Sequence, residues 1–123
     1  MRSTRNEFVD YVVEFMSGWA PVTARRMFGG HGLYLDGLMF ALIADDQLCF
    51  KTDAANEPQF ERAGSHPFVY TSPTRTVRMS YWSAPEDSLE SAAEMNSWCL
   101  SAYAAALRAR AARSAKSGEG KHK

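Results

Sequence analysis

The chain has 123 residues, of which 46% are hydrophobic, 12% aromatic and 23% charged. This balance is typical of one small globular domain; it excludes disorder throughout, and the length leaves no room for a second domain. The net charge is zero, but residues 108–123 carry +5 and residues 1–107 carry −5. An acidic body argues against a protein that binds nucleic acid over its whole surface.

No apolar run approaches the roughly 20 residues that span a bilayer, and the chain starts with an amphipathic pattern rather than a signal peptide. We therefore expect a cytoplasmic protein with no membrane contact. Cys49 and Cys99 lie in apolar surroundings, which indicates buried free thiols. The cysteines and the three histidines lack the spacing of metal ligands, so we expect neither a metal nor another cofactor.

The first predicted element is a helix that begins at the capping-box pair Thr4 and Glu7 and ends near Gly18. The residues spaced to share its apolar face are Phe8, Tyr11, Val12 and Phe15. Residues 23–34 are then predicted to form one strand, 38–44 a central strand covered on both faces, and 47–51 a third strand. The turns between them fall at Asp36-Gly37 and Asp45-Asp46.

Asn56 as a capping residue, Pro58 in the first turn and Gly64 as a stop predict a short second helix. Residues 68–70 and 76–82 are predicted to form a hairpin. The last helix is predicted from about residue 87 to Arg113, which closes a domain of residues 1–113, and residues 114–123 have the composition of a disordered basic tail. The order α-β-β-β-α-β-β-α predicts an α+β domain with one antiparallel sheet.

The apolar stripe of the last helix is broad, because Met95, Trp98 and Ala102 extend it to an adjoining face. Packing against the first helix would explain this width. A surface for a partner protein, or for self-association into a homodimer, is the alternative.

The segment 25–34 contains many residues that could take part in binding or catalysis. They are Arg25, Arg26, Phe28, Gly29, Gly30, His31, Gly32 and Tyr34. Free glycine amides beside two arginines could bind phosphate, but neither nucleotide-loop spacing is present and no helix follows. The favoured interpretation is that the glycines create a bulge or sharp bend in the first strand. His31 could act as a general base, yet nothing in the sequence orients it, so no catalytic residue is assigned.

Lys51, Arg75 and Arg78 could join Arg25 and Arg26 in a basic patch, although charges that protect strand edges are the usual interpretation. Base stacking on an open sheet face is a further possibility, but core or rim packing is favoured. The aromatic residues concerned are Tyr34, Tyr70, Tyr81 and Trp82.

The combined motifs resemble the N-terminal domain of the TfoX/Sxy competence regulators. The matching segments are Arg26 to Tyr34, Asp36-Gly37, Phe40 to Ile43, Phe50 to Asp53, Pro67 to Tyr70 and Met79 to Trp82 with Pro85. They occur in the family's order from about Phe8 to Ala106.

The resemblance implies a two-layer domain with a five-stranded antiparallel sheet, similar to secretion-chaperone-like folds. It also implies a non-catalytic accessory role in transcription, through contacts with the cAMP receptor protein or RNA polymerase. After Ala106 the sequence offers only a helix end and a basic tail, so we expect a stand-alone domain without the second, C-terminal domain of the full-length regulators; such a domain could serve other promoters or have another role. The expected contact residues are Arg25, Arg26, His31 and the face formed by Met95 and Trp98; Lys51 and Tyr81 belong to the matching motifs.

Two alternatives remain open at this point. One is direct binding of nucleic acid through the basic tail and Arg25-Arg26, with each neutralised phosphate adding to the salt dependence. The other is an enzyme or small-anion binder at the glycine-rich segment.

Overall fold

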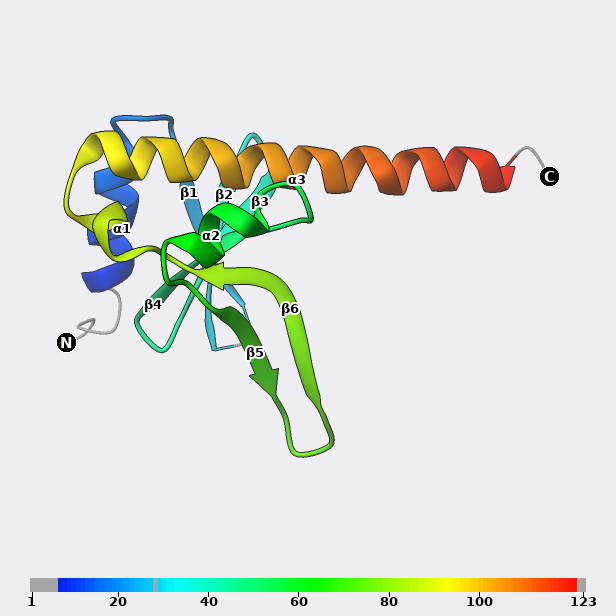
Figure 1. Ribbon diagram of the computed structural model, residues 1–123, viewed down its shortest axis with the longest axis horizontal. Coiled ribbons are helices and arrows are strands. Elements are labelled where there is room, and N and C mark those ends of the chain that lie inside the picture. The colour runs from blue at the N-terminus through cyan, green and yellow to red at the C-terminus, as the bar shows by residue number, and fades with distance from the viewer. Residues whose placement is uncertain (1–6, 28, 122–123) are drawn as a thin grey trace.

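The computed structural model describes residues 7–27 and 29–121 of the chain. Its elements in chain order are α1 (Glu7–Met16), β1 (Thr23–Met27), β2 (Gly30–Leu35), β3 (Leu38–Ala44), β4 (Gln47–Lys51), α2 (Glu57–Arg62), β5 (Pro67–Thr71), β6 (Thr76–Ser83), the 3-10 helix η2 (Glu86–Leu89) and α3 (Ala92–Lys121) (Figure 1). The predicted α+β class and the antiparallel sheet are confirmed. Among the described residues, no helix is both long and apolar enough to cross a membrane.

The sheet has six strands in the order β1-β2-β3-β4-β6-β5, so the expected count of five is wrong. The error lies in residues 23–34, which form two strands instead of one. Gly29 adopts a φ of +78°, which lets the chain reverse and pairs Met27 with Gly30. The glycines therefore make a hairpin turn and not the expected bend within one strand.

The other two predicted turns are present, and both use the left-handed backbone region. Asp36 and Gly37 have φ values of 52° and 77°, and Asp45 and Asp46 have 53° and 57°. Aspartate tolerates this conformation better than most residues, and such turns match the twist of hairpin strands. Between them, the pairing of β2 with β3 shifts at Leu33 and Tyr34 and leaves Phe40 as an extra residue. The resulting bulge lets Phe40 and its neighbour Ala41 both enter the core.

Helix α1 ends close to the predicted position, but the face it buries differs from the expected one. Its buried side chains are Val9, Val12 and Met16, whereas Tyr11 is 50% exposed and stacks on Phe15. The i, i+3, i+4 pattern fits both faces, and the face of Val9, Val12 and Met16 is the one that enters the main core. Thr4 of the expected capping box lies outside the described residues.

Helix α2 forms where predicted, with Asn56 at its N-cap and Pro58 in its first turn. The Asn56 side chain does not cap the helix, however. It accepts a hydrogen bond from the backbone N–H of Asp53 and donates to the backbone oxygens of Lys51 and Ser101. Asn56 therefore fastens the corner between β4 and α2 to the last helix.

Helix α3 begins at Ala92, later than expected, because residues 86–89 form η2. Ser91 caps the new helix: its hydroxyl accepts a hydrogen bond from the backbone N–H of Glu94. Helix α3 also continues to Lys121, past the expected end at Arg113. The last helix therefore ends later than expected, because residues 114–121 prolong a helix that is already nucleated, and extending a helix is far easier than starting one.

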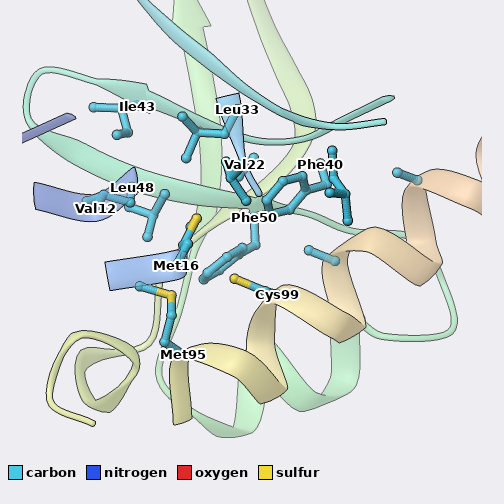
Figure 2. Packing of buried hydrophobic residues seen from close by; sticks show 14 of the residues in the cluster. Val12, Met16, Val22, Leu33, Phe40, Ile43, Leu48, Phe50, Met95 and Cys99 are labelled. Atoms are coloured by element: carbon cyan, nitrogen blue, oxygen red, sulfur yellow. The ribbon is translucent and has the colours of Figure 1, made fainter. Parts of the chain in front are cut away.

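All the helices contribute to one core on a single face of the sheet. Figure 2 shows Val12 and Met16 of α1, Leu33 and Phe40 of the sheet, and Cys99 of α3 converging there, and all of them are buried. Helix α3 crosses the sheet and extends beyond it, while the β5–β6 hairpin projects away from the helices (Figure 1). The opposite face of the sheet, called the open face below, carries no helix among the described residues.

Candidate interaction face

A second, smaller apolar cluster lies on the open face. Leu42, Cys49 and Tyr81 are its buried members, and Met39, Ala44, Phe68 and Met79 pack against them while remaining partly exposed. These residues belong to β3, β4, β5 and β6, so the cluster connects the centre of the sheet to the outer hairpin.

The β5–β6 hairpin bends beside this cluster and creates a cavity. The strand register shifts between Pro67 and Val69, with two more residues on the β6 side, and such an irregularity bends a strand pair. The cavity, called the apolar hollow below, has a volume of about 260 Å³. Its apolar lining consists mainly of Met27, Met39, Leu42, Phe68, Val77 and Met79, and His31, Tyr70 and Arg75 add polar groups.

Two cation–aromatic pairs lie next to each other on the open face. The guanidinium of Arg25 lies 4.7 Å from the ring centre of Tyr34, and Lys51 Nζ lies 5.3 Å from that of Tyr81. Lys51 Nζ also donates a hydrogen bond to Ser80 Oγ at 2.6 Å. The structure thus brings together four of the residues that the sequence analysis selected.

Burial alters the acid–base behaviour of this group. Burial first and the neighbouring Tyr34 second raise the pKa of Tyr81 to about 12, against an opposing effect of Arg113 of α3. The pKa of Lys51 is lowered, first by burial and then by Arg113, with Asp53 acting in the opposite direction. Tyr81 is therefore a neutral phenol at neutral pH and suits hydrogen bonding rather than proton transfer.

Gly32 allows the first two strands to contribute to the open face. A Cβ atom at this position would lie 2.8 Å from the sulfur of Met27, 3.0 Å from the Tyr34 ring and 3.1 Å from the sulfur of Met39. The missing side chain is what makes room for two methionines beside the Arg25–Tyr34 pair.

The rest of the glycine-rich segment borders a different and more polar cavity of about 200 Å³. Arg26, Gly29, Gly30 and His31 line it together with Val9, Ile43, Asp45 and Asp46. Two carboxylates of the β3–β4 turn therefore lie at the place where a phosphate would have to bind. Their charge disfavours an anion there, so the geometry does not support the phosphate interpretation. Phe28 lies outside the described residues.

The face formed by Met95 and Trp98 is not available to a partner in the way expected. Met95 has no exposed surface, and the Trp98 ring lies 4.7 Å from the ring centre of the buried Phe60. Packing against Phe60 of α2 accounts for Trp98, whereas Met95 belongs to the main core, which it shares with α1, the helix expected to cover this face. The large apolar residues that α3 exposes are instead Leu100, at 61%, and Leu107, at 37%.

The possible basic patch is divided between the two sides of the sheet. Arg25, Lys51 and Arg75 belong to the open face, whereas Arg78 stacks over Trp82, a residue of the helix-covered core, at 5.9 Å. The hollow itself was not predicted from the sequence. Its signal was the alternation of Val77, Met79 and Tyr81, which predicts a shared face but not the bend that makes a cavity.

The family model described as TfoX N-terminal domain matches residues 14–106 of the chain. The search of curated proteins gives no match. The matched range begins within α1 and ends in α3, so it includes the whole sheet and every residue that lines the apolar hollow. Within the described residues there is no group of three His, Cys, Asp or Glu side chains that could hold a metal ion.

Proposed function

Because this chain belongs to the TfoX N-terminal domain family, we propose that it is a non-catalytic regulatory domain that acts through contacts with other proteins. The family match supports a regulatory or competence-related role in general terms. The mode of action is our proposal, and so are its first candidate partners, the cAMP receptor protein and RNA polymerase.

The observation that carries the proposal is the composition of the open face. Protein interfaces are enriched in aromatic residues, methionine and arginine and depleted of acidic residues. The open face presents three methionines in one hollow, flanked by Tyr34, Tyr70, Arg25 and Arg75. An apolar cavity with a few polar groups at its border also fits a surface that receives a side chain of a partner.

Capture experiments with purified proteins test this function. The immobilised domain is exposed to RNA polymerase and to the cAMP receptor protein with cAMP, each with and without nuclease treatment. Retention after nuclease is the expected result, since the contact is with protein. Retention that requires nucleic acid would instead favour the DNA-binding alternative, and no retention of either protein would contradict the proposed partners.

A matched pair of variants on one strand makes the test specific for the open face. Tyr70 lines the apolar hollow and is 43% exposed, whereas Val69, the preceding residue, faces the other side and is 48% exposed. We expect Tyr70→Ala to weaken capture and Val69→Ala to leave it unchanged. Equal effects of the two substitutions would exclude the open face as the contact surface.

A further inference from the structure

The charges on the sheet have one sign. Within the described residues, the six strands contain no aspartate and no glutamate, although the chain as a whole has 14. Their charged side chains are Arg25, Arg26, Lys51 and Arg78. A neutral protein therefore presents a positive sheet, and its aspartates and glutamates lie in helices, turns and loops.

On the open face these cations lie around an apolar cavity. Arg75 lines the hollow directly. Arg25 lies over Tyr34, whose ring is next to the place where Met27 and Met39 converge at Gly32. A ligand in the hollow would therefore have a positive charge on each side of it.

The hollow is suited to a single large apolar side chain. Its volume of about 260 Å³ is slightly below the roughly 300 Å³ at which pockets for drug-sized molecules begin. Met27, Met39 and Met79 supply much of its wall, and flexible thioethers adapt their packing to different apolar groups.

We propose that the open face binds an acidic segment of a partner protein, with one large apolar side chain of that segment in the apolar hollow and its carboxylates beside Arg25 and Arg75. The inference rests on the proposed function and defines the chemistry of the partner. It requires a segment with a Leu, Ile, Met, Phe or Trp anchor flanked by Asp or Glu. Attraction between unlike charges then sets orientation and association rate, and burial of the anchor supplies affinity.

The same observations disfavour nucleic acid as the occupant. Base stacking needs free aromatic faces, but the cations of Arg25 and Lys51 already lie over the rings of Tyr34 and Tyr81. Tyr81 is in addition buried. The hollow also has an apolar wall, which offers a base edge few hydrogen-bond partners.

A random peptide library tests the inference without a known partner. Displayed peptides of about twelve residues are selected on the wild-type domain, and enriched peptides are titrated by fluorescence anisotropy. We expect the selected sequences to share one large apolar residue with acidic neighbours. Enrichment of basic sequences, or no enrichment above background, would overturn the inference.

Charge reversal at two arginines locates the binding site. Arg75 contributes only backbone groups to the turn that it shares with Ser72, so its side chain can be changed without loss of those hydrogen bonds. Arg75→Glu should lower the affinity for the enriched peptides about threefold to tenfold, as expected for an exposed charge that changes sign. Arg78→Glu, on the opposite face, should leave affinity unchanged. Equal weakening by both variants would place the peptide elsewhere, and thermal melts of both check the fold.

The proposed function and the proposed partner chemistry can fail separately. If the domain captures polymerase or the receptor but selects no acidic peptides, the proposed function stands and the partner chemistry is wrong. If the domain selects acidic peptides, and Arg75→Glu weakens their binding, but it captures neither protein, then the open face is a peptide site and the proposed partners are wrong.

Discussion

Arg108 of α3 donates two hydrogen bonds to the carboxylate of Asp53, from Nε to Oδ2 at 2.6 Å and from Nη2 to Oδ1 at 3.0 Å. Asp53 Oδ1 also accepts the backbone N–H groups of Ala55 and Asn56. One carboxylate therefore joins the last helix to the corner that follows β4. These hydrogen bonds, above all that from Arg108, lower the pKa of Asp53.

The Asp53–Arg108 pair makes stability depend on pH. Because the pKa of Asp53 is lower in the folded than in the unfolded state, its contribution is complete above the unfolded value of about 3.9 and is lost as the pH falls further. We expect Asp53→Asn to cost about 0.5–1 kcal/mol at pH 7, the range for a well-formed surface pair. Urea unfolding at pH 7 and pH 3 measures this cost, which should shrink at pH 3. A cost of equal size at both pH values would show that the charge is unimportant.

Asn56 should be more important for stability than its surface neighbours. Its amide is buried and joins Asp53, Lys51 and Ser101. Asn56→Ala leaves these backbone groups without their partner, which should cost about 2 kcal/mol. Ser101→Ala removes two longer hydrogen bonds of its hydroxyl, one from Asn56 and one to Gln59, and serves as the control, with an expected cost below about 1 kcal/mol. Denaturant unfolding measures both costs. Similar losses of unfolding free energy for the two variants would show that Asn56 does not hold the corner between β4 and α2 to α3.

Trp98 should act on stability and not on recognition. Its ring packs on Phe60, so Trp98→Ala should cost about 2–3 kcal/mol, somewhat less than for a fully buried tryptophan. Leu100→Ala, an exposed position two residues later, should change stability by less than about 0.5 kcal/mol. Calorimetry gives both values. If Trp98→Ala weakened partner capture at a temperature where it remains folded, the assignment of Trp98 to the core would be wrong.

Gly30 is required by the close approach of two strands. A Cβ atom there would overlap the main-chain carbonyl of Ile43, whereas a Cβ at Gly18 would meet nothing within 4 Å. We expect Gly30→Ala to destabilise the domain by about 2 kcal/mol and Gly18→Ala to be neutral within about 0.5 kcal/mol. Thermal unfolding of the two variants tests the difference. Equal thermal unfolding midpoints for the two variants would mean that β2 and β3 can move apart at little cost in free energy.

Both cysteines should be unreactive in the folded domain. Cys49 and Cys99 are buried, and burial raises the pKa of each thiol to about 12. At pH 8 almost no thiolate is present, so iodoacetamide should leave both unmodified in native protein and alkylate both in urea. Mass spectrometry counts the adducts. Rapid alkylation of the native protein would show frequent local opening of the sheet or of α3.

Turn chemistry and apolar periodicity were sufficient to predict most of the fold. Asp36-Gly37, Asp45-Asp46, Asn56-to-Gly64 and the last hairpin all appear in their predicted places. The additional strand was missed because glycine permits both a bulge and a reversal, and only the pairing of Met27 with Gly30 decides between them. That choice depends on the neighbouring strands and not on local propensity.

The candidate site was less predictable for a related reason. The matching motifs included Tyr34, Lys51 and Tyr81, which do meet on the open face. Met95 and Trp98 fit a helix face equally well whether the partner is α2 or another protein, so periodicity could not place them. The hollow arises from a register shift in the β5–β6 pair, a feature without any signature in the order of residues.

The position of α3 at the end of the fold has a consequence for synthesis. Met95, Cys99 and Ala102 close the core over strands that leave the ribosome much earlier. At about 5–20 residues per second, the inner side of β2 and β3 stays uncovered for several seconds before this helix emerges. The nascent sheet therefore exposes apolar surface throughout that interval, and chaperone engagement should end only when the helix docks.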